Sequence, residues 1–404
     1  MMTRELLGER YSPLFFLAAL GAGGLSVSFF MYPMFLIAHP DTPMVTFNHL
    51  WPILFGDNLA AAAALAVDLG LILAFALLHF WLLAWNLTQY RAFRRSDGFR
   101  KLRNSNAEVS LMAIPLTLAM TINVLFVLGA VFVPNLWRIV EYLFPVALLA
   151  FLVVGVMALR ILSDYFYRII VRGDFDFEAN NNLAQMIAIF ALSMIAVGFA
   201  GPGAMSHNVA INAIGIFLSI LFLSLAMVLT FLKLVLGFKS ILRHGIAVKS
   251  SSSLWILIPI LTLVGITVIR LSMGLHHGLN ADLNNASFFV LASVILSLQI
   301  LIGLLGYKVM TRIGYFRDYV AGSKGDASTF SLICPGVAFT VFGIFFIHFG
   351  LVKNGLIQHM SLAHIVLLIP LLLIQLKTIQ VFFRLSCQHL SLGFGRCRIL
   401  PQAA

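Results

Sequence analysis

The stretch Ser328–Phe339, STFSLICPGVAF, opens the ninth of ten long apolar segments and holds the first clue to the fold. It places Cys334, the helix-breaking Pro335 and a glycine side by side in a segment long enough to cross a bilayer. Proline removes a backbone donor and clashes with the preceding turn, which costs about 3 kcal/mol in a helix interior. A membrane protein tolerates such a break where neighbouring helices or water satisfy the freed carbonyl groups. The stretch therefore predicts an irregular helix beside a cavity.

The composition is that of a polytopic membrane protein. Of 404 residues, 61% are hydrophobic and only 10% are charged, whereas a soluble domain has about 25% charged residues. The net charge of +11 does not indicate nucleic-acid binding, because most Lys and Arg lie in short loops between apolar segments. The three cysteines are too few for a disulfide framework. No nucleotide, metal or cofactor motif occurs, so we expect neither an enzyme nor a resident cofactor or metal.

Ten segments are long and apolar enough to span a membrane, which takes about 20 mainly apolar residues. We predict an all-α fold with a cytoplasmic N-terminus at 1–11, a transmembrane domain at 12–385 and a cytoplasmic tail at 386–404. The first segment is too long for a signal-peptide core, so we expect it to be retained. The predicted spans are 12–38, 58–86, 108–133, 140–167, 183–204, 208–236, 253–276, 286–310, 329–352 and 362–385.

Basic residues fall mainly on one side of these spans. The loops opposite hold only Arg138 and Lys353. Because cytoplasmic loops carry an excess of Lys and Arg, we predict a multi-pass protein of the inner (plasma) membrane with both termini in the cytoplasm. The residues on the basic side are Arg91, Arg94, Arg95, Arg100, Lys101, Arg103, Arg168, Arg172, Lys239, Arg243, Lys249, Arg312, Arg317, Lys324, Arg396 and Arg398.

Every odd-numbered segment carries a proline, while among the even-numbered segments only the fourth and tenth do, at Pro145 and Pro370. Kinked backbone is tolerated in a membrane where it lines a cavity or the protein interior. The pattern predicts five helical hairpins, whose irregular odd helices enclose a central pore and whose regular even helices face lipid. The odd-segment prolines are Pro33, Pro115, Pro202, Pro259 and Pro335.

Small and polar residues in the odd segments are further pore candidates. Gly21, Gly24 and Ser28 share a narrow helix face, which allows close helix packing or lines a lumen. Thr117 and Thr121 share a face of the third segment, but Asn123 lies about 160° around the helix from Thr121. The fifth segment has a clear break at its end. The candidates for the pore and its gate are Phe330, Cys334, Pro335, Phe339, Gly24, Ser28, Pro115, Thr117, Thr121, Gly201, Pro202 and Pro259.

Two charged residues lie deep in apolar segments. Arg270 in the seventh segment either extends its head to the surface or faces an aqueous vestibule, where it would attract anions. Asp68 in the second segment serves either a helix–helix hydrogen bond or proton transfer. Histidines in or near several segments lack the repeated spacing that would favour haem ligation.

The order of these features resembles the TehA-type tellurite-resistance/dicarboxylate transporter family, which includes the plant slow anion channels. The resemblance covers about residues 12–385. It rests on the Gly-rich first segment with Ser28-Phe-Phe, on Pro115, on the Ser253-to-Pro259 start of the seventh segment and on Phe330 before the ninth-segment proline. It implies five hairpins around a pore, a homotrimer with one pore per protomer, and passive conduction of a small anion. It also implies an occluding phenylalanine on the ninth helix.

The chain departs from that family directly before Pro335, where Cys334 stands in place of phenylalanine. In this it is similar to a cysteine-bearing branch, the TsoY-like proteins. The residues and the resemblance together predict a passive anion channel or transporter, constricted near the ninth helix. Two alternatives remain for Cys334: a redox-linked protein or transporter of sulfur or selenium compounds, which uses the thiol, or a buried cysteine that only fills the core.

Overall fold

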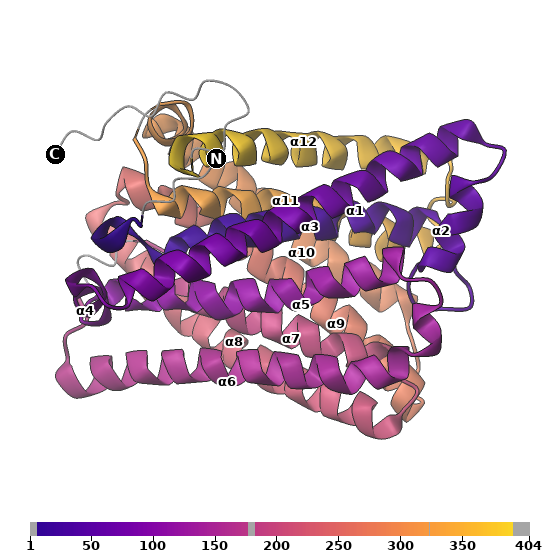
Figure 1. Ribbon diagram of the computed structural model, residues 1–404, viewed down its shortest axis with the longest axis horizontal. Helices are drawn as coiled ribbons and strands as arrows, with labels where there is room; N and C mark the ends of the chain where they lie inside the picture. Colours follow the sequence, from indigo (N-terminus) through magenta and orange to yellow (C-terminus); the bar gives the residue numbers. More distant parts are fainter. Residues whose placement is uncertain (1–5, 177–181, 323, 391–404) are drawn as a thin grey trace.

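A computed structural model of the chain describes residues 6–176, 182–322 and 324–390. It is a bundle of long, roughly parallel helices, and the described residues contain no strand (Figure 1). Both described chain ends lie toward one end of the bundle, here called the terminal end. The opposite end, which carries the short helix α2 (Phe47–Leu54), is called the loop end. The basic tail residues Arg396 and Arg398 fall outside the described residues.

Among the residues that the structure describes, ten helical spans are long and apolar enough to cross a membrane, which agrees with the predicted number. Several of these helices continue well beyond the apolar run, into stretches that contain charged residues. The spans are built on α1 (Phe16–Leu36), α3 (Leu59–Phe93), α5 (Ala113–Phe132), α6 (Val140–Arg172), α7 (Ile187–Met205), α8 (Val209–His244), α9 (Leu257–Leu279), α10 (Asn285–Arg312), α11 (Ile333–Phe345) and α12 (Leu362–Leu390). A short helix, α4 (Asp97–Arg103), follows α3 at the terminal end.

Burial divides these spans into two classes that alternate along the chain. Among the most apolar 18 residues of each span, 56–94% are buried in the odd-numbered spans and 22–33% in the even-numbered ones. The fifth span, α7, is the most enclosed at 94%. The even spans instead expose large aliphatic and aromatic side chains such as Leu77, Phe217 and Leu301. Their apolar surfaces are suited to contact with lipid.

The inner spans contact one another in a closed cycle. Helix α1 contacts α5, α5 contacts α7, α7 contacts α9, α9 contacts α11, and α11 contacts α1. Each inner span also contacts the even span that follows it along the chain. Glycines permit some of these approaches: a Cβ at Gly21 would lie 2.9 Å from Ile333 of α11, and one at Gly24 would lie 3.1 Å from Val337. These glycines therefore allow α1 and α11 to pack closely.

The sequence suggested that the prolines break the inner helices, but the structure shows no break at mid-span in the helices that it describes. Pro115, Pro259 and Pro335 each occupy the third position of their α-helix, where a missing N–H costs little because the first N–H groups lack a partner within the helix. A 3-10 helix precedes each of these helices. The irregularity thus lies near the terminal end, in η3 (Asn106–Met112), η6 (Val248–Trp255) and η8 (Ala327–Leu332). The ninth span also changes to a π-helix, η9 (Phe346–Val352), toward the loop end.

A buried ion-pair network ties three segments together at the terminal end. Glu108 of η3 pairs with Arg168 of α6 at 2.8 Å and with Arg103 at 2.9 Å. Arg168 also pairs with Asp174 at 2.6 Å. The side chains of Glu108 and Arg168 are 2% and 7% exposed, so neither charge has water as its main partner. Each needs the other, because an unpaired buried charge is costly.

Candidate functional site

A cavity of about 270 Å³ lies among the inner helices. Its walls come from α1, α5, α7, α9 and α11, with η9 and two residues of α6, Ala147 and Phe151. It runs from the level of Leu20 on α1 to the loop end, where Pro43 and Met44 line it. The cavity thus lies inside the cycle of inner helices.

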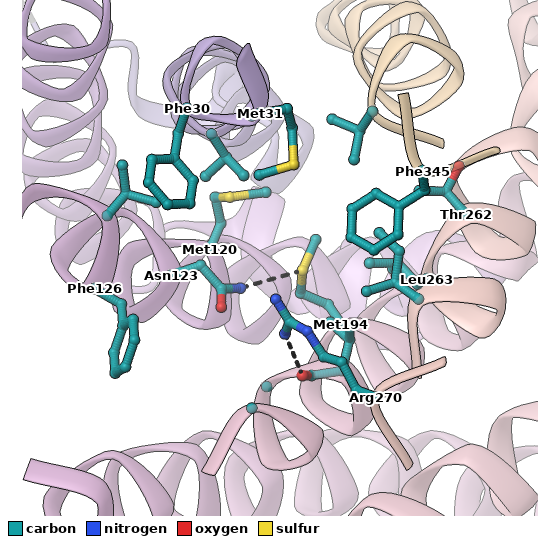
Figure 2. Close-up of a pocket in the computed structure, with 18 of the residues that line it drawn as sticks. Phe30, Met31, Met120, Asn123, Phe126, Met194, Thr262, Leu263, Arg270 and Phe345 are labelled. Atoms are coloured by element: carbon teal, nitrogen blue, oxygen red, sulfur yellow. Dashed lines mark hydrogen bonds between the residues drawn. The ribbon is translucent and has the colours of Figure 1, made fainter. Parts of the chain in front are cut away.

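Arg270 of α9 projects into this cavity (Figure 2). Its Nη1 donates a hydrogen bond to the carbonyl oxygen of Val197 on α7 at 3.1 Å. No Asp or Glu belongs to the cavity lining, and Arg270 forms no ion pair in the described part of the chain. The guanidinium points toward the side chains of Asn123 and Met194. A cation in an apolar interior without a carboxylate partner favours the entry of an anion.

The remaining wall is mainly apolar, and aliphatic side chains share it with many methionines and phenylalanines. Other polar side chains are few, and they include Asn123, Thr262 and the thiol of Cys334. Thr262 donates to the carbonyl oxygen of Ala338 at 3.0 Å, so its hydroxyl is already engaged. Within the described residues, the amide nitrogen of Asn123 has one hydrogen-bond contact, to the Met194 sulfur at 3.6 Å, and a thioether is a weak acceptor. The apolar lining includes Met31, Met34, Met44, Met120, Met194, Met205, Met273, Phe30, Phe35, Phe126, Phe151, Phe190, Phe345 and Phe349.

A packed aromatic cluster lies on the terminal side of the cavity. Phe330 is fully buried and does not line the cavity. Its ring centroid lies 6.3 Å from that of Phe15 and 5.6 Å from that of His389. Phe330 is one turn before Cys334, which does line the cavity and is 8% exposed. This aromatic cluster therefore packs next to the part of the lining that contains Cys334.

Histidines gather around the loop end of the cavity. The ring of His348 lies 4.6 Å from that of Phe35, a lining residue, and His359 contacts the Phe35 carbonyl oxygen at 3.0 Å. His39 and His49 have ring centroids 6.1 Å apart in the segment that holds Pro43 and Met44. Imidazole side chains from several segments therefore lie close to the loop end of the cavity.

Six of the residues predicted for the pore line the cavity, and the others do not. Those that do are Cys334, Gly24, Gly201, Pro202, Pro259 and Arg270. Those that do not are Phe330, Pro335, Phe339, Ser28, Pro115, Thr117, Thr121 and Asp68.

The polar residues outside the lining bond to neighbouring helices instead. Thr117 donates to the carbonyl oxygens of Ala113 and Phe16, and Thr121 contacts Nε2 of His79 at 2.9 Å. Ser28 accepts a hydrogen bond from Gln375 of α12 at 2.8 Å. Their hydroxyl groups are satisfied within the packed bundle, so these residues join helices.

Asp68 is half-buried on α3, away from the cavity lining. One of its carboxyl oxygens, Oδ2, is buried and has no hydrogen-bond partner in the described residues. Tyr32 of α1 lies near enough to interact with this carboxyl group electrostatically. Its surroundings are the interface between α1 and α3, so a proton route through the cavity would not pass Asp68.

Sequence reasoning missed the methionines. Seven of the 15 methionines in the chain line this one cavity. Met31 and Met34 are three residues apart on α1, but this spacing looks like ordinary core packing. Asn123 was set aside because it does not share a face with Thr117 and Thr121, yet it is the member of that set that reaches the cavity.

Comparison with known proteins adds no identification. The chain matches no protein-family model, no curated protein and no solved structure.

Proposed function

We propose that this protein lets small anions cross a membrane through the space enclosed by its five inner helices. In this proposal each inner span and the even span after it form a hairpin, and five such hairpins surround a central path. The cyclic contacts among the inner helices support the arrangement. The alternation between buried and exposed spans supports an inner ring shielded from lipid by the outer helices.

The strongest support for the proposal is the position of Arg270. Its guanidinium faces a cavity with no lining carboxylate, and it lies near the middle of the membrane-spanning helix α9. Basic residues deep in membrane segments often mark ion or substrate pathways. A single cation in an otherwise weakly polar path attracts anions without holding them tightly, and conduction requires such weak binding.

The aromatic cluster at Phe330 is the proposed constriction. It closes the path on the terminal side, while the cavity reaches the loop end. The basic residues of the terminal end make this the cytoplasmic side by the positive-inside rule. The resemblance to the TehA-type family further suggests location in an inner membrane and assembly as a homotrimer, which native mass spectrometry can test.

Anion flux from liposomes tests the proposed function. Wild type and Phe330→Ala are reconstituted, and chloride and nitrate efflux are measured. We expect Phe330→Ala to release anions at least about tenfold faster, because removing the ring opens the constriction. The substitution also costs about 3–5 kcal/mol of packing, so folding is checked in parallel. Absence of flux from both folded proteins would contradict the proposal.

A second candidate function follows from Cys334. Its side chain lines the cavity, so a molecule there can reach the thiol. This position supports a redox-linked role or the transport of sulfur or selenium compounds. If Cys334→Ala conducts chloride like wild type but no longer handles a thiol-reactive substrate, the thiol role is established. Identical behaviour of both proteins toward such a substrate would leave Cys334 as a packing residue.

A further inference from the structure

The cavity is larger and more apolar than an inorganic anion requires. Its volume of about 270 Å³ approaches the lower limit for sites that bind small organic molecules, about 300 Å³. Such sites are mostly apolar and carry a few polar groups that fix the orientation of the ligand. The same description applies to this cavity, whose polar groups are few and whose walls are mainly methionine, phenylalanine and aliphatic side chains.

The polar groups are arranged for a single anionic group. Arg270 has five N–H donors, and the structure assigns one hydrogen bond of its guanidinium to Val197. Asn123 points to the same region, and its amide has only a weak sulfur contact to give up (Figure 2). The lining offers no second Arg or Lys. One carboxylate or sulfonate can therefore be bound by Arg270 and Asn123, and the other polar side chains of the lining are Thr262, Cys334 and His277.

The methionines suit a flexible apolar body. Met is unbranched and polarisable, so it fits ligands of differing shape. Met120 and Met194 flank the region of Arg270, and Phe30 and Phe345 form facing walls (Figure 2). A hydrocarbon chain bound here would leave water and would contact these side chains.

We propose that the cavity binds an amphipathic organic monoanion, with its anionic group on Arg270 and Asn123 and its apolar body against the methionine and phenylalanine walls. This inference rests on the proposed function and names the substrate class of that same path. Thioether and thiol groups also bind soft cations. The position of Arg270 among them, with no lining carboxylate, disfavours a cation.

Binding of linear alkanesulfonates tests the proposal, because these anions stay charged and do not cross lipid as neutral acids. The full-length protein is placed in nanodiscs and titrated by calorimetry with methane-, butane- and hexanesulfonate, with empty nanodiscs subtracted. Hexyltrimethylammonium serves as the ligand of matched body and opposite charge. Arg270→Gln removes the cation, and Arg138→Gln removes an exposed arginine outside the cavity.

We expect affinity to rise about fourfold per added methylene until the cavity is filled. Arg270→Gln should weaken every sulfonate at least about tenfold, whereas Arg138→Gln should bind like wild type. The affinities of the wild-type protein for the three sulfonates still test the proposal if Arg270→Gln does not fold. Equal affinity along the series, undiminished binding to folded Arg270→Gln, or equally tight binding of the ammonium ligand would each overturn the proposal.

The transport function and the organic-anion assignment can be contradicted by different results. If liposomes show chloride flux but sulfonates neither bind nor compete, only the organic-anion assignment is wrong. If sulfonates bind as expected but neither wild type nor Phe330→Ala passes any anion, the cavity is a binding site and the transport function is wrong.

Discussion

Replacing Gly201 with leucine should block the cavity while leaving the fold intact. Gly201 lies on α7 among the cavity-lining residues. A Cβ added there would meet only Arg270 Nη1 and Met205 Cε, both at 3.8 Å, which is ordinary van der Waals contact. The new side chain would therefore occupy open space directly beside the guanidinium.

The expected effects on stability and on flux differ in size. Replacing a helical glycine gains roughly 0.5–1 kcal/mol. The position before Pro202 disfavours helical geometry for a residue with a Cβ, which offsets that gain. We expect a net stability change within about 1 kcal/mol. Flux should fall at least tenfold, equivalent to about 1.4 kcal/mol, because leucine displaces the anion from Arg270.

The assay is anion efflux from liposomes in the Phe330→Ala background, where flux should be highest. Gly70→Leu is the matched control, because Gly70 is exposed on α3 and an added Cβ would meet nothing within 4 Å. Thermal unfolding of each variant is measured alongside. Unchanged flux through folded Gly201→Leu, or an equal loss in Gly70→Leu, would refute the assignment of the cavity as the path.

Two further predictions concern stability and pH. Glu108→Ala should lower the free energy of unfolding by about 3 kcal/mol, because it removes the buried carboxylate shared by Arg168 and Arg103 and leaves Arg168 with Asp174 as its carboxylate partner. Asp97→Ala, at an exposed pair, should cost less than about 1 kcal/mol in the same thermal assay. Burial lowers the pKa of His39 from its usual 6.5, so the folded loop favours the neutral ring and loses stability as pH falls below about 6.5. Hydrogen exchange of residues 38–46, corrected for intrinsic rates, should quicken at pH 5.5 relative to pH 7.5, and His39→Gln should lack this change.

The number of spans and their division into inner and outer helices follow from sequence because both depend on local composition. Length and hydropathy identify each span, and proline and glycine concentrate where helices pack on helices. The odd-numbered spans, which all carry a proline, are the more buried ones, but three of these prolines do not interrupt a helix. Pro115, Pro259 and Pro335 lie in first turns after 3-10 segments, where a missing N–H costs little.

The cavity itself could be predicted only in part, because it depends on which way each helix is turned. Arg270 stood out as a charge deep in an apolar segment, and Gly201 as part of the break at the end of the fifth segment. Thr117 and Ser28 are equally polar, yet they bond to neighbouring helices. The methionine lining carries no pattern that separates a cavity wall from a packed core, since Met serves both.

The rate at which a water-soluble anionic methanethiosulfonate modifies Cys334 tests whether water reaches the space between the inner helices. Cys387 and Cys397 are first replaced by alanine, and the reagent is added on the side of the loop end. The account predicts modification of the folded protein from that side, slowed at least tenfold by Gly201→Leu. A thiol that stays unmodified until the protein is denatured would show that no water-filled route reaches the space between the inner helices.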